Sequence, residues 1–174
     1  MRLFFALELP GETARAVATW RDRELAPVGR PVPAANFHIT LAFVGELPAP
    51  RLERLCLAVD EWVSRDAPVG GHLQLDRTGY WQKPGIYWLG PSRWPQQLTA
   101  LAQKLGGLSS GSGGKRDKRR LQPHVTLFRG CQPSPPAPVR QPHFALDYHH
   151  FALFESRQGK SGVSYQPLAH WDLR

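Results

Sequence analysis

Short apolar or alternating runs bounded by Pro or Gly recur along the 174-residue sequence and predict a series of β-strands. The expected strands are Arg2 to Leu9, Phe37 to Val44, His72 to Asp76, Ile86 to Leu89, His124 to Phe128, Phe144 to Phe154 and Val163 to Leu168. Most of the predicted regular structure is therefore strand.

Helical spacing separates some of these strands. Between Arg51 and Arg65 the apolar residues recur three and four positions apart, which is typical of one face of a helix. Leu98, Leu101 and Leu105 predict a second helix in the same way, and a weaker pattern predicts a third over Glu12 to Leu25. The mixture of helices and strands indicates an α+β fold.

Two segments interrupt the pattern. Gly106 to Arg120 is rich in Gly and Ser and ends in the basic run Lys115 to Arg120, so we expect a mobile loop there, because burying those charges is unfavourable. Gln132 to Pro142 is rich in Pro and predicts turns. Neither segment divides the chain into parts large enough to fold alone, so we expect residues 1–174 to form a single domain.

Composition and charge restrict the class of protein. Hydrophobic residues make up 41% of the chain and charged residues 21%, as in an ordinary globular protein. The formal net charge of +8 comes more from arginine than from lysine. Because arginine binds phosphate bidentately and stacks on rings, this balance favours a polyanionic partner, nucleic acid first. A generally basic surface without a specific partner explains the charge equally well.

The cysteines and the start of the chain indicate a compartment. Cys56 and Cys131 lie far apart in sequence, and Met1 leads at once into a predicted strand rather than a signal peptide. We therefore expect a cytoplasmic protein without disulfides. No apolar stretch approaches the roughly 18 residues that a membrane span requires, so no membrane association is expected.

An internal repeat is the most informative feature of the sequence. Asn36 to Leu41 and Gln122 to Leu127 share the pattern His, β-branched, Thr, Leu. Because side chains of a strand alternate between faces, His38 and Thr40 are expected on one face, opposite Phe37, Ile39, Leu41 and Phe43. His124 and Thr126 repeat this arrangement, opposite Val125 and Leu127. If the two strands face each other, two imidazoles and two hydroxyls meet in one cleft.

This set of groups suits attack on a phosphodiester without a metal. One neutral imidazole takes a proton from water, one imidazolium protonates the departing oxygen, and threonine hydroxyls donate to the non-bridging oxygens. Histidine serves both roles because its ordinary pKa of about 6.5 leaves both protonation states available near neutrality. A strained cyclic phosphate needs less assistance than an ordinary RNA diester.

The two His-x-Thr-Leu copies resemble the signature of the 2H phosphoesterase superfamily. The whole chain is similar to its bacterial RNA 2′,3′-cyclic phosphodiesterases, long called 2′-5′ RNA ligases. The similar stretches are Arg2 to Leu7, Asn36 to Glu46, Trp88 to Gly90, Pro123 to Leu127 with Arg129 following, and Tyr165 to Trp171. The segment Ser109 to Gly114 is the least similar part.

The resemblance implies a bilobal α+β fold, in which two pseudo-symmetric antiparallel sheets flank a central cleft with helices outside. It implies that His38 is the proton donor and His124 the proton acceptor, and that Thr40 and Thr126 bind phosphate oxygens. The implied product is a 2′-phosphate, and the reverse reaction forms a 2′-5′ bond. The implied partners are RNA with a 2′,3′-cyclic phosphate end or cyclic nucleotides, with no cofactor, no metal and a monomeric protein.

Three weaker features each have two interpretations. Arg129 binds phosphate only if the strand ends or twists before it, because it otherwise shares the face of Val125 and Leu127. Phe128 either stacks a base or packs against the cleft wall. The aromatic residues between Tyr80 and Trp88 form either a platform for bases or part of the core.

Other functions are weighed against these motifs. Seven histidines, among them His143, His149 and His150, are candidate zinc ligands, but none follows the usual ligand spacings. A non-catalytic RNA-binding module would not need both histidines and both threonines of the repeat. Another 2H activity, on 2′-5′ oligonucleotides or small cyclic nucleotide phosphates, stays open.

Overall fold

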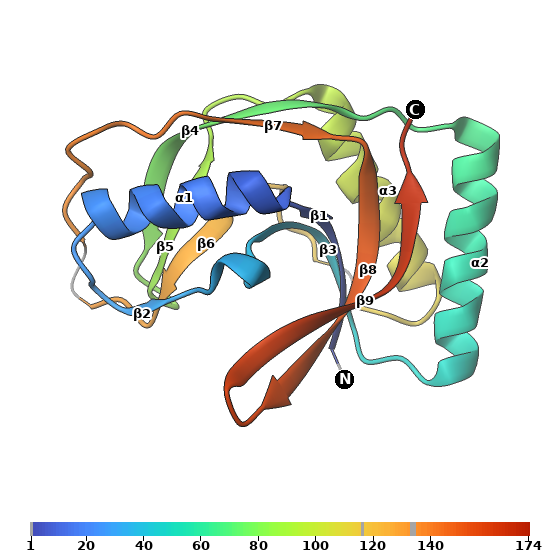
Figure 1. Cartoon of the computed structure of the whole chain (residues 1–174). Helices are drawn as coiled ribbons and strands as arrows, with labels where there is room; N and C mark the ends of the chain where they lie inside the picture. Colours follow the sequence, from blue (N-terminus) through green and yellow to red (C-terminus); the bar gives the residue numbers. More distant parts are fainter. Residues whose placement is uncertain (1, 116, 133–134) are drawn as a thin grey trace.

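The computed structural model describes residues 2–115, 117–132 and 135–174, and Figure 1 shows the arrangement of its elements. In chain order these are β1 (Arg2–Glu8), α1 (Gly11–Glu24), β2 (Arg30–Pro31), the 3-10 helix η1 (Ala34–Asn36), β3 (His38–Gly45), α2 (Ala49–Asp66), β4 (Gly71–Trp81), β5 (Ile86–Pro91), α3 (Gln96–Gly111), β6 (Val125–Arg129), β7 (Phe144–Tyr148), β8 (His150–Gly159) and β9 (Gly162–Asp172). The three predicted helices and the mixture of helix and strand are confirmed.

The strands form two antiparallel sheets. Sheet A has the strand order β3-β1-β8-β9, and sheet B has the order β2-β6-β5-β4-β7. Each sheet contains one copy of the repeat, on β3 and at the start of β6, and these two strands contact each other. The predicted fold of two antiparallel sheets, each contributing one motif, is therefore confirmed.

Helices cover the outer faces of both sheets. Helix α3 packs against β3, and α2 packs against α3 and β9, so both cover sheet A (Figure 1). Helix α1 packs on sheet B, where Trp20 meets Phe144 of β7 edge to face. The largest buried cluster contains side chains from both sheets, including Phe5 and Ile39 of sheet A with Leu89 of sheet B. The opposite face of each sheet is left for the site.

The predicted strand Phe144 to Phe154 is wrong as a single element. The structure interrupts it at His149, so that β7 lies at the edge of sheet B and β8 lies within sheet A. Leu146, before the interruption at His149, and Leu153, after it, are both buried. The apolar pattern continues across the break because both halves contribute to the core.

The predicted loop Gly106 to Arg120 is partly wrong, because α3 continues to Gly111. Ser109 extends the buried stripe of this helix, and its hydroxyl donates to the Leu105 carbonyl oxygen at 2.7 Å. The helical glycines face open space, so they need no side chain to pack. The described residues after α3 contain no helix or strand before β6, and Arg116 lies outside the described residues.

Two further expectations concern the membrane and the cysteines. In the described ranges, no helix is both long and apolar enough to cross a bilayer. Cys56 and Cys131 both carry free thiols, so the prediction of no disulfide is confirmed. Cys131 is fully buried and Cys56 is half-buried.

Candidate active site

The two motif histidines are held in the same way by the backbone. His38 Nδ1 lies 2.8 Å from the Asn36 carbonyl oxygen, and His124 Nδ1 lies 2.8 Å from the Gln122 carbonyl oxygen. A carbonyl oxygen only accepts, so in both residues the proton is on Nδ1 and the imidazole donates. Each neutral ring therefore presents Nε2, without a proton, as the atom available for proton transfer.

The threonines lie on the same faces as the histidines. Thr40 Oγ1 is 3.1 Å from His38 Nε2 and donates to it when the ring is neutral. Both motif histidines and both threonines are half-buried, whereas Ile39 and Val125 between them are fully buried. The alternation predicted for the first three positions of each repeat is confirmed.

Both motif strands then carry a β-bulge at the leucine after the threonine. On β3, Phe5 pairs with Ala42 and Ala6 with Thr40, so Leu41 has no partner of its own. On β6, Tyr87 pairs with Phe128 and Trp88 with Thr126, so Leu127 is the extra residue. A bulge places two successive side chains on one side and shifts the alternation of the following residues.

The bulges decide which of the following residues are exposed and which are buried. Leu41 and Ala42 are both buried, and Phe43, which was predicted to face the core, is instead 54% exposed. Its ring lies 6.5 Å from Phe4, which also contacts His38. The prediction for Phe43 is therefore wrong, and the physical reason is the extra residue on β3. Phe43 follows His38 at the same spacing at which Arg129 follows His124. This shared spacing was the sequence signal that could have identified Phe43 as an exposed residue near the histidine.

The second bulge has the same effect on Arg129. This residue is exposed, and its positive charge lowers the pKa of both His38 and His124, so the guanidinium lies within electrostatic reach of both imidazoles. Of the two interpretations of Arg129, the structure therefore favours the one in which the strand twists before it.

Phe128 is buried by the same bulge. It is 3% exposed, and its ring packs against Tyr87 and lies under the Arg21 guanidinium. The proposed base-stacking role of Phe128 is therefore wrong, because no face of the ring is open to a base. The alternative interpretation, that Phe128 packs the interior behind the cleft, describes the structure.

Aromatic rings surround both histidines. The His38 ring centre lies 5.1 Å from Phe4 and 4.9 Å from Tyr165, and that of His124 lies 4.6 Å from Trp81. Trp88 also contacts His124 at 6.3 Å, but it is only 2% exposed, so it belongs to the wall and not to an open platform. These rings restrict water around the imidazoles and hold them in place.

Burial and charge both act on the histidine pKa values. Burial lowers the pKa of His38 to about 4, with the Asn36 carbonyl acting in the opposite direction and Arg129 and His124 lowering it further. Burial also lowers the pKa of His124, where the Gln122 carbonyl opposes the shift and Arg129 adds to it. Both imidazoles are therefore neutral near pH 7 in the free protein.

We predict that Arg129→Gln moves the pH profile of kcat/KM to higher pH. This profile reports the free protein, so the optimum of the native chain is expected below pH 6.5, and removing the positive charge raises both histidine pKa values. The measurement is kcat/KM on a cyclic phosphate across pH 4 to 8. Arg54→Gln is the matched control, because Arg54 is an exposed arginine of α2. A profile unchanged by Arg129→Gln would show that its charge does not act on the reacting groups.

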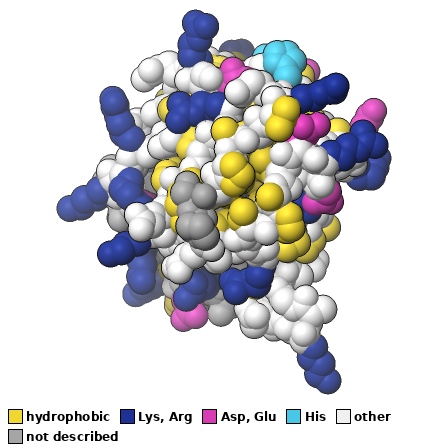
Figure 2. All heavy atoms as spheres, turned by 90° about the vertical axis from the view of Figure 1, so that its left-hand side faces the viewer, with side chains coloured by type: hydrophobic (Ala, Val, Ile, Leu, Met, Phe, Trp, Pro, Cys, Tyr) yellow, Lys and Arg dark blue, Asp and Glu magenta, His cyan; other side chains and the backbone are white. Residues whose placement is uncertain are grey.

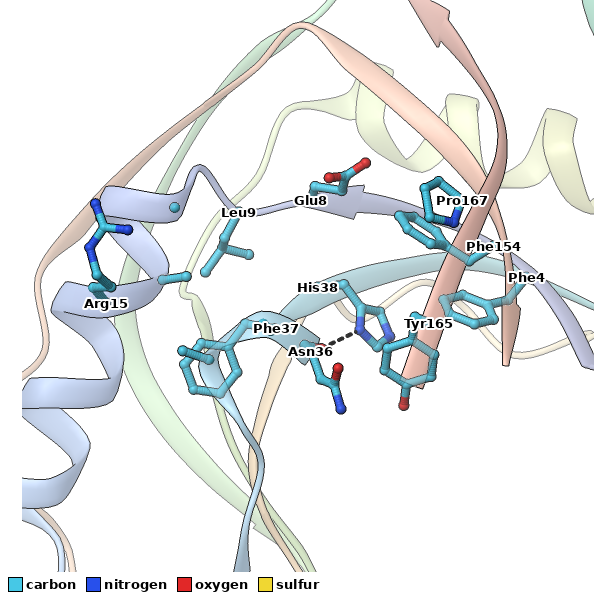
Figure 3. Close-up of a pocket in the computed structure, with 14 residues that line it drawn as sticks. Phe4, Glu8, Leu9, Arg15, Asn36, Phe37, His38, Phe154, Tyr165 and Pro167 are labelled. Atoms are coloured by element: carbon cyan, nitrogen blue, oxygen red, sulfur yellow. Dashed lines mark hydrogen bonds between the residues drawn. The ribbon is translucent and has the colours of Figure 1, made fainter. Parts of the chain in front are cut away.

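A cavity of about 430 Å³ lies beside His38. Figure 3 shows His38, Tyr165 and Phe4 together at one end and Arg15 at the other. Its volume is in the range that small ligands occupy. In the ranges that the structure describes, no group of three or more His, Cys, Asp or Glu side chains could hold a metal ion.

Two antiparallel sheets that bring two His-x-Thr strands together define the class of 2H phosphoesterases. Residues 7–88 match a family model described as LigT like Phosphoesterase. The RNA 2′,3′-cyclic phosphodiesterase of Escherichia coli is 34% identical over 99% of this chain and 96% of its own length. That of Thermus thermophilus is 32% identical over 100% of this chain and 91% of its own.

The solved structures agree with the sequence relatives. The crystal structure of E. coli LigT complexed with 3′-AMP superposes with a TM-score of 0.89 at 34% identity, covering 99% of this chain and 97% of that one. The chain therefore belongs to the LigT-like phosphoesterase family, and the resemblance seen in the sequence is confirmed.

Proposed function

We propose that this protein hydrolyses the 2′,3′-cyclic phosphate at the end of RNA to a 2′-phosphomonoester, and that the reverse steps join a 5′-hydroxyl in a 2′-5′ bond. One observation carries the proposal: two imidazoles on contacting strands, each with its Nδ1 proton bound to a backbone carbonyl and a threonine two residues further on. The curated relatives have the name RNA 2′,3′-cyclic phosphodiesterase, which supports the same reaction.

In the proposed reaction, His124 Nε2 takes a proton from water as the water oxygen bonds to phosphorus. The bond between phosphorus and O3′ breaks, and His38 Nε2–H gives its proton to O3′, which leaves the phosphate on O2′. Thr40 and Thr126 donate to the non-bridging oxygens, and Arg129 balances the charge that develops on them. The assignment of His38 as acid and His124 as base comes from the family resemblance.

The low pKa of His38 requires a source for the proton that it donates. Burial and the positive charge of Arg129 keep this imidazole neutral in the free protein. A bound cyclic phosphate brings a negative charge beside the ring, which favours the protonated form. We infer that the substrate anion raises the pKa of His38 on binding, so that the acid is charged only in the complex.

The exposed Phe43 ring is the proposed contact for the terminal base. It lies on the same face as the motif residues, and an open aromatic ring stacks any base without sequence preference. The related LigT of E. coli has been solved with 3′-AMP, with ATP and with NADP+, which supports nucleotides as the ligand class.

We propose that both lobes form one domain, because buried side chains of both sheets belong to one cluster. A cytoplasmic location and a monomeric state stay predictions from the sequence and the resemblance. The native mass in solution checks the monomer directly.

The proposed function is tested with purified protein, EDTA and a short RNA that ends in a 2′,3′-cyclic phosphate. We expect a monoester that phosphatase removes and that co-migrates with the 2′-phosphate standard. Parallel reactions contain a 2′-5′ oligonucleotide and a 3′,5′-cyclic nucleotide. Faster turnover of either of these, or a 3′-phosphate product, would contradict the proposal.

We also predict that the basic run between α3 and β6 binds the RNA backbone beyond the reacting end. Lys115 N–H donates to Val44 O at 3.0 Å, so the run begins at the end of β3 next to Phe43. Lys118 and Arg120 are exposed, whereas Arg119 is bound by Asp117. Neutralising Lys118 and Arg120 to Gln is expected to weaken oligonucleotide binding and to flatten its salt dependence.

A mononucleotide cyclic phosphate separates this effect from catalysis. It does not reach the basic run, so its turnover is expected to stay unchanged in the Lys118→Gln/Arg120→Gln variant. The matched control removes two other exposed charges, Arg23 of α1 and Arg54 of α2. It is needed because positive side chains are spread widely over the face in Figure 2, so net charge alone also affects binding. Equal loss in the control would show that the run has no special role.

A further inference from the structure

One charged side chain of helix α1 is buried in the interior. Arg21 is 5% exposed and shares the buried stripe of α1 with Ala14 and Val17. Its Nε donates to Asp22 Oδ1 at 3.0 Å, but that carboxylate is mostly exposed, so the pair offsets little of the cost of burying a guanidinium. An apolar side chain would fill the stripe without that cost. Helix packing alone therefore does not explain why an arginine is buried at this position.

The Arg21 guanidinium contacts β6 and the segment that leads into β3. Its Nη1 donates to the backbone oxygens of Val32 and Leu127. Its central carbon lies 5.5 Å from the centre of the Phe37 ring and 5.4 Å from that of Phe128. A guanidinium between two aromatic rings is attracted to both, and its several N–H groups bind two carbonyls at once.

On the side of β3, the contact lies next to the first catalytic candidate. Phe37 immediately precedes His38 and is 5% exposed. Its neighbour Asn36 supplies the carbonyl that fixes the His38 tautomer. A shift of the Phe37 ring therefore moves the backbone that holds His38 in position.

On the side of β6, the contact lies at the bulge. Leu127 is the extra residue of that bulge, and its carbonyl oxygen accepts both Arg21 and, at 2.9 Å, the Val32 N–H. The bulge shifts the alternation of the strand, so that Arg129 is exposed, within electrostatic reach of the two imidazoles. The Arg21 guanidinium and the Val32 N–H both donate to the Leu127 carbonyl oxygen, and together they fix the backbone at the bulge.

We propose that Arg21 is a positioning residue, which fixes β3 and β6 relative to each other and so aligns His38, His124 and Arg129. The role rests on the proposed function of these three residues. Arg21 itself does not touch substrate, since it is buried behind the strands. A small misplacement of reacting groups lowers turnover about 10- to 100-fold, which sets the expected size of the effect.

The test compares Arg21→Met with Arg23→Met. Methionine keeps an unbranched apolar chain in the stripe but removes the charge, both carbonyl bonds and the ring contacts. Arg23 is exposed on the same turn of α1, so its variant loses the same charge without these contacts. We expect kcat/KM on a mononucleotide cyclic phosphate to fall about 10- to 100-fold for Arg21→Met and to stay near the native value for Arg23→Met.

The pH profile separates positioning from simple destabilisation. The charged or titratable groups near His124 are Arg129 of β6, His38 of β3 and, over the Trp88 ring, Arg77. If Arg21→Met lets Arg129 move away, the profile of kcat/KM moves to higher pH, as in Arg129→Gln. In an Arg129→Gln background, Arg21→Met should then produce no further shift of the profile.

Thermal unfolding establishes the temperature at which each variant is folded, and activity is measured below it. If Arg21→Met does not fold, Arg21→Lys replaces it, since lysine keeps the charge but lacks the planar guanidinium that contacts the Phe37 and Phe128 rings. A lower melting temperature with native kcat/KM and a native pH profile would overturn the positioning role. If Arg21→Met shifts the pH profile of the Arg129→Gln protein as much as that of the native protein, Arg21 does not act through Arg129.

Failure of this proposal is distinguishable from failure of the proposed function. His38→Ala and His124→Ala are measured on the same substrate. If these two variants keep their activity, the proposed function is wrong. If they are inactive while Arg21→Met and Arg21→Lys match the native protein, only the positioning role is wrong.

Discussion

His38→Ala and His124→Ala are each expected to lower kcat/KM on an RNA 2′,3′-cyclic phosphate about 10²-fold or more in the presence of EDTA. Each imidazole presents one Nε2 atom for proton transfer, because its Nδ1–H is bound to a backbone carbonyl. Thr40→Ala and Thr126→Ala should lose less, since a hydroxyl donates one hydrogen bond and transfers no proton.

His72→Ala is the matched control for these variants. His72 is an exposed histidine of β4 bound to Asp147, so its loss removes an imidazole without touching the cleft. Native-like melting temperatures show that a variant is folded. Loss of native activity in EDTA, restored by zinc or magnesium, would falsify the metal-free mechanism. If His38→Ala or His124→Ala reacts at the native rate, the substituted histidine takes no part in the reaction.

With a diester that carries a nitrophenolate leaving group in the same orientation, His38→Ala is expected to recover much of its lost rate, whereas His124→Ala stays impaired. A leaving group of low pKa departs without a proton, so it no longer needs the acid, but the attacking water still needs the base. The rates of both variants are compared between this diester and the natural cyclic phosphate.

The pH profiles provide an independent check of the same assignment. On the natural substrate, His38→Ala should lose the basic limb of the bell-shaped profile, and His124→Ala should lose the acidic limb. Rescue of His124→Ala by the good leaving group would mean that the two roles are reversed. Equal rescue of both variants would mean that neither histidine has a fixed role.

Most of the secondary structure and the four central residues of the site follow from the amino-acid sequence alone. Strand periodicity places His38 and Thr40 on one face and Ile39 on the other, and this needs no knowledge of neighbouring strands. The repetition of the pattern at His124 and Thr126 indicated paired catalytic groups. The repeat also carried the resemblance that implied two antiparallel sheets.

The continuation of each motif depended on the neighbouring strand. The expected alternation fails after Leu41 and Leu127, because each is an extra residue opposite β1 or β5. A bulge is a property of how two strands pair, and a single apolar run does not reveal it. For this reason Phe43 was predicted to be buried and Phe128 was considered for base stacking, although the structure has the opposite arrangement.

Tertiary contacts also set where the elements at His149 and Gly111 end. The run from Phe144 to Phe154 is apolar throughout, so nothing local indicates that its two halves join different sheets. The end of α3 includes glycines that disfavour helix, but the packing of α3 against β3 and the burial of Ser109 offset that preference. In both cases contacts with distant parts of the chain override local pattern.

Arg21 is a further residue whose role depends on tertiary contacts and not on the local sequence pattern. In the sequence it is one arginine among many in a weakly amphipathic helix, and its charge predicts exposure. Only the packing of α1 between the segments that precede His38 and follow Thr126 buries it. The sequence therefore specifies which groups carry out the chemistry, whereas tertiary packing sets how they are aligned, because alignment depends on contacts between segments about 100 residues apart.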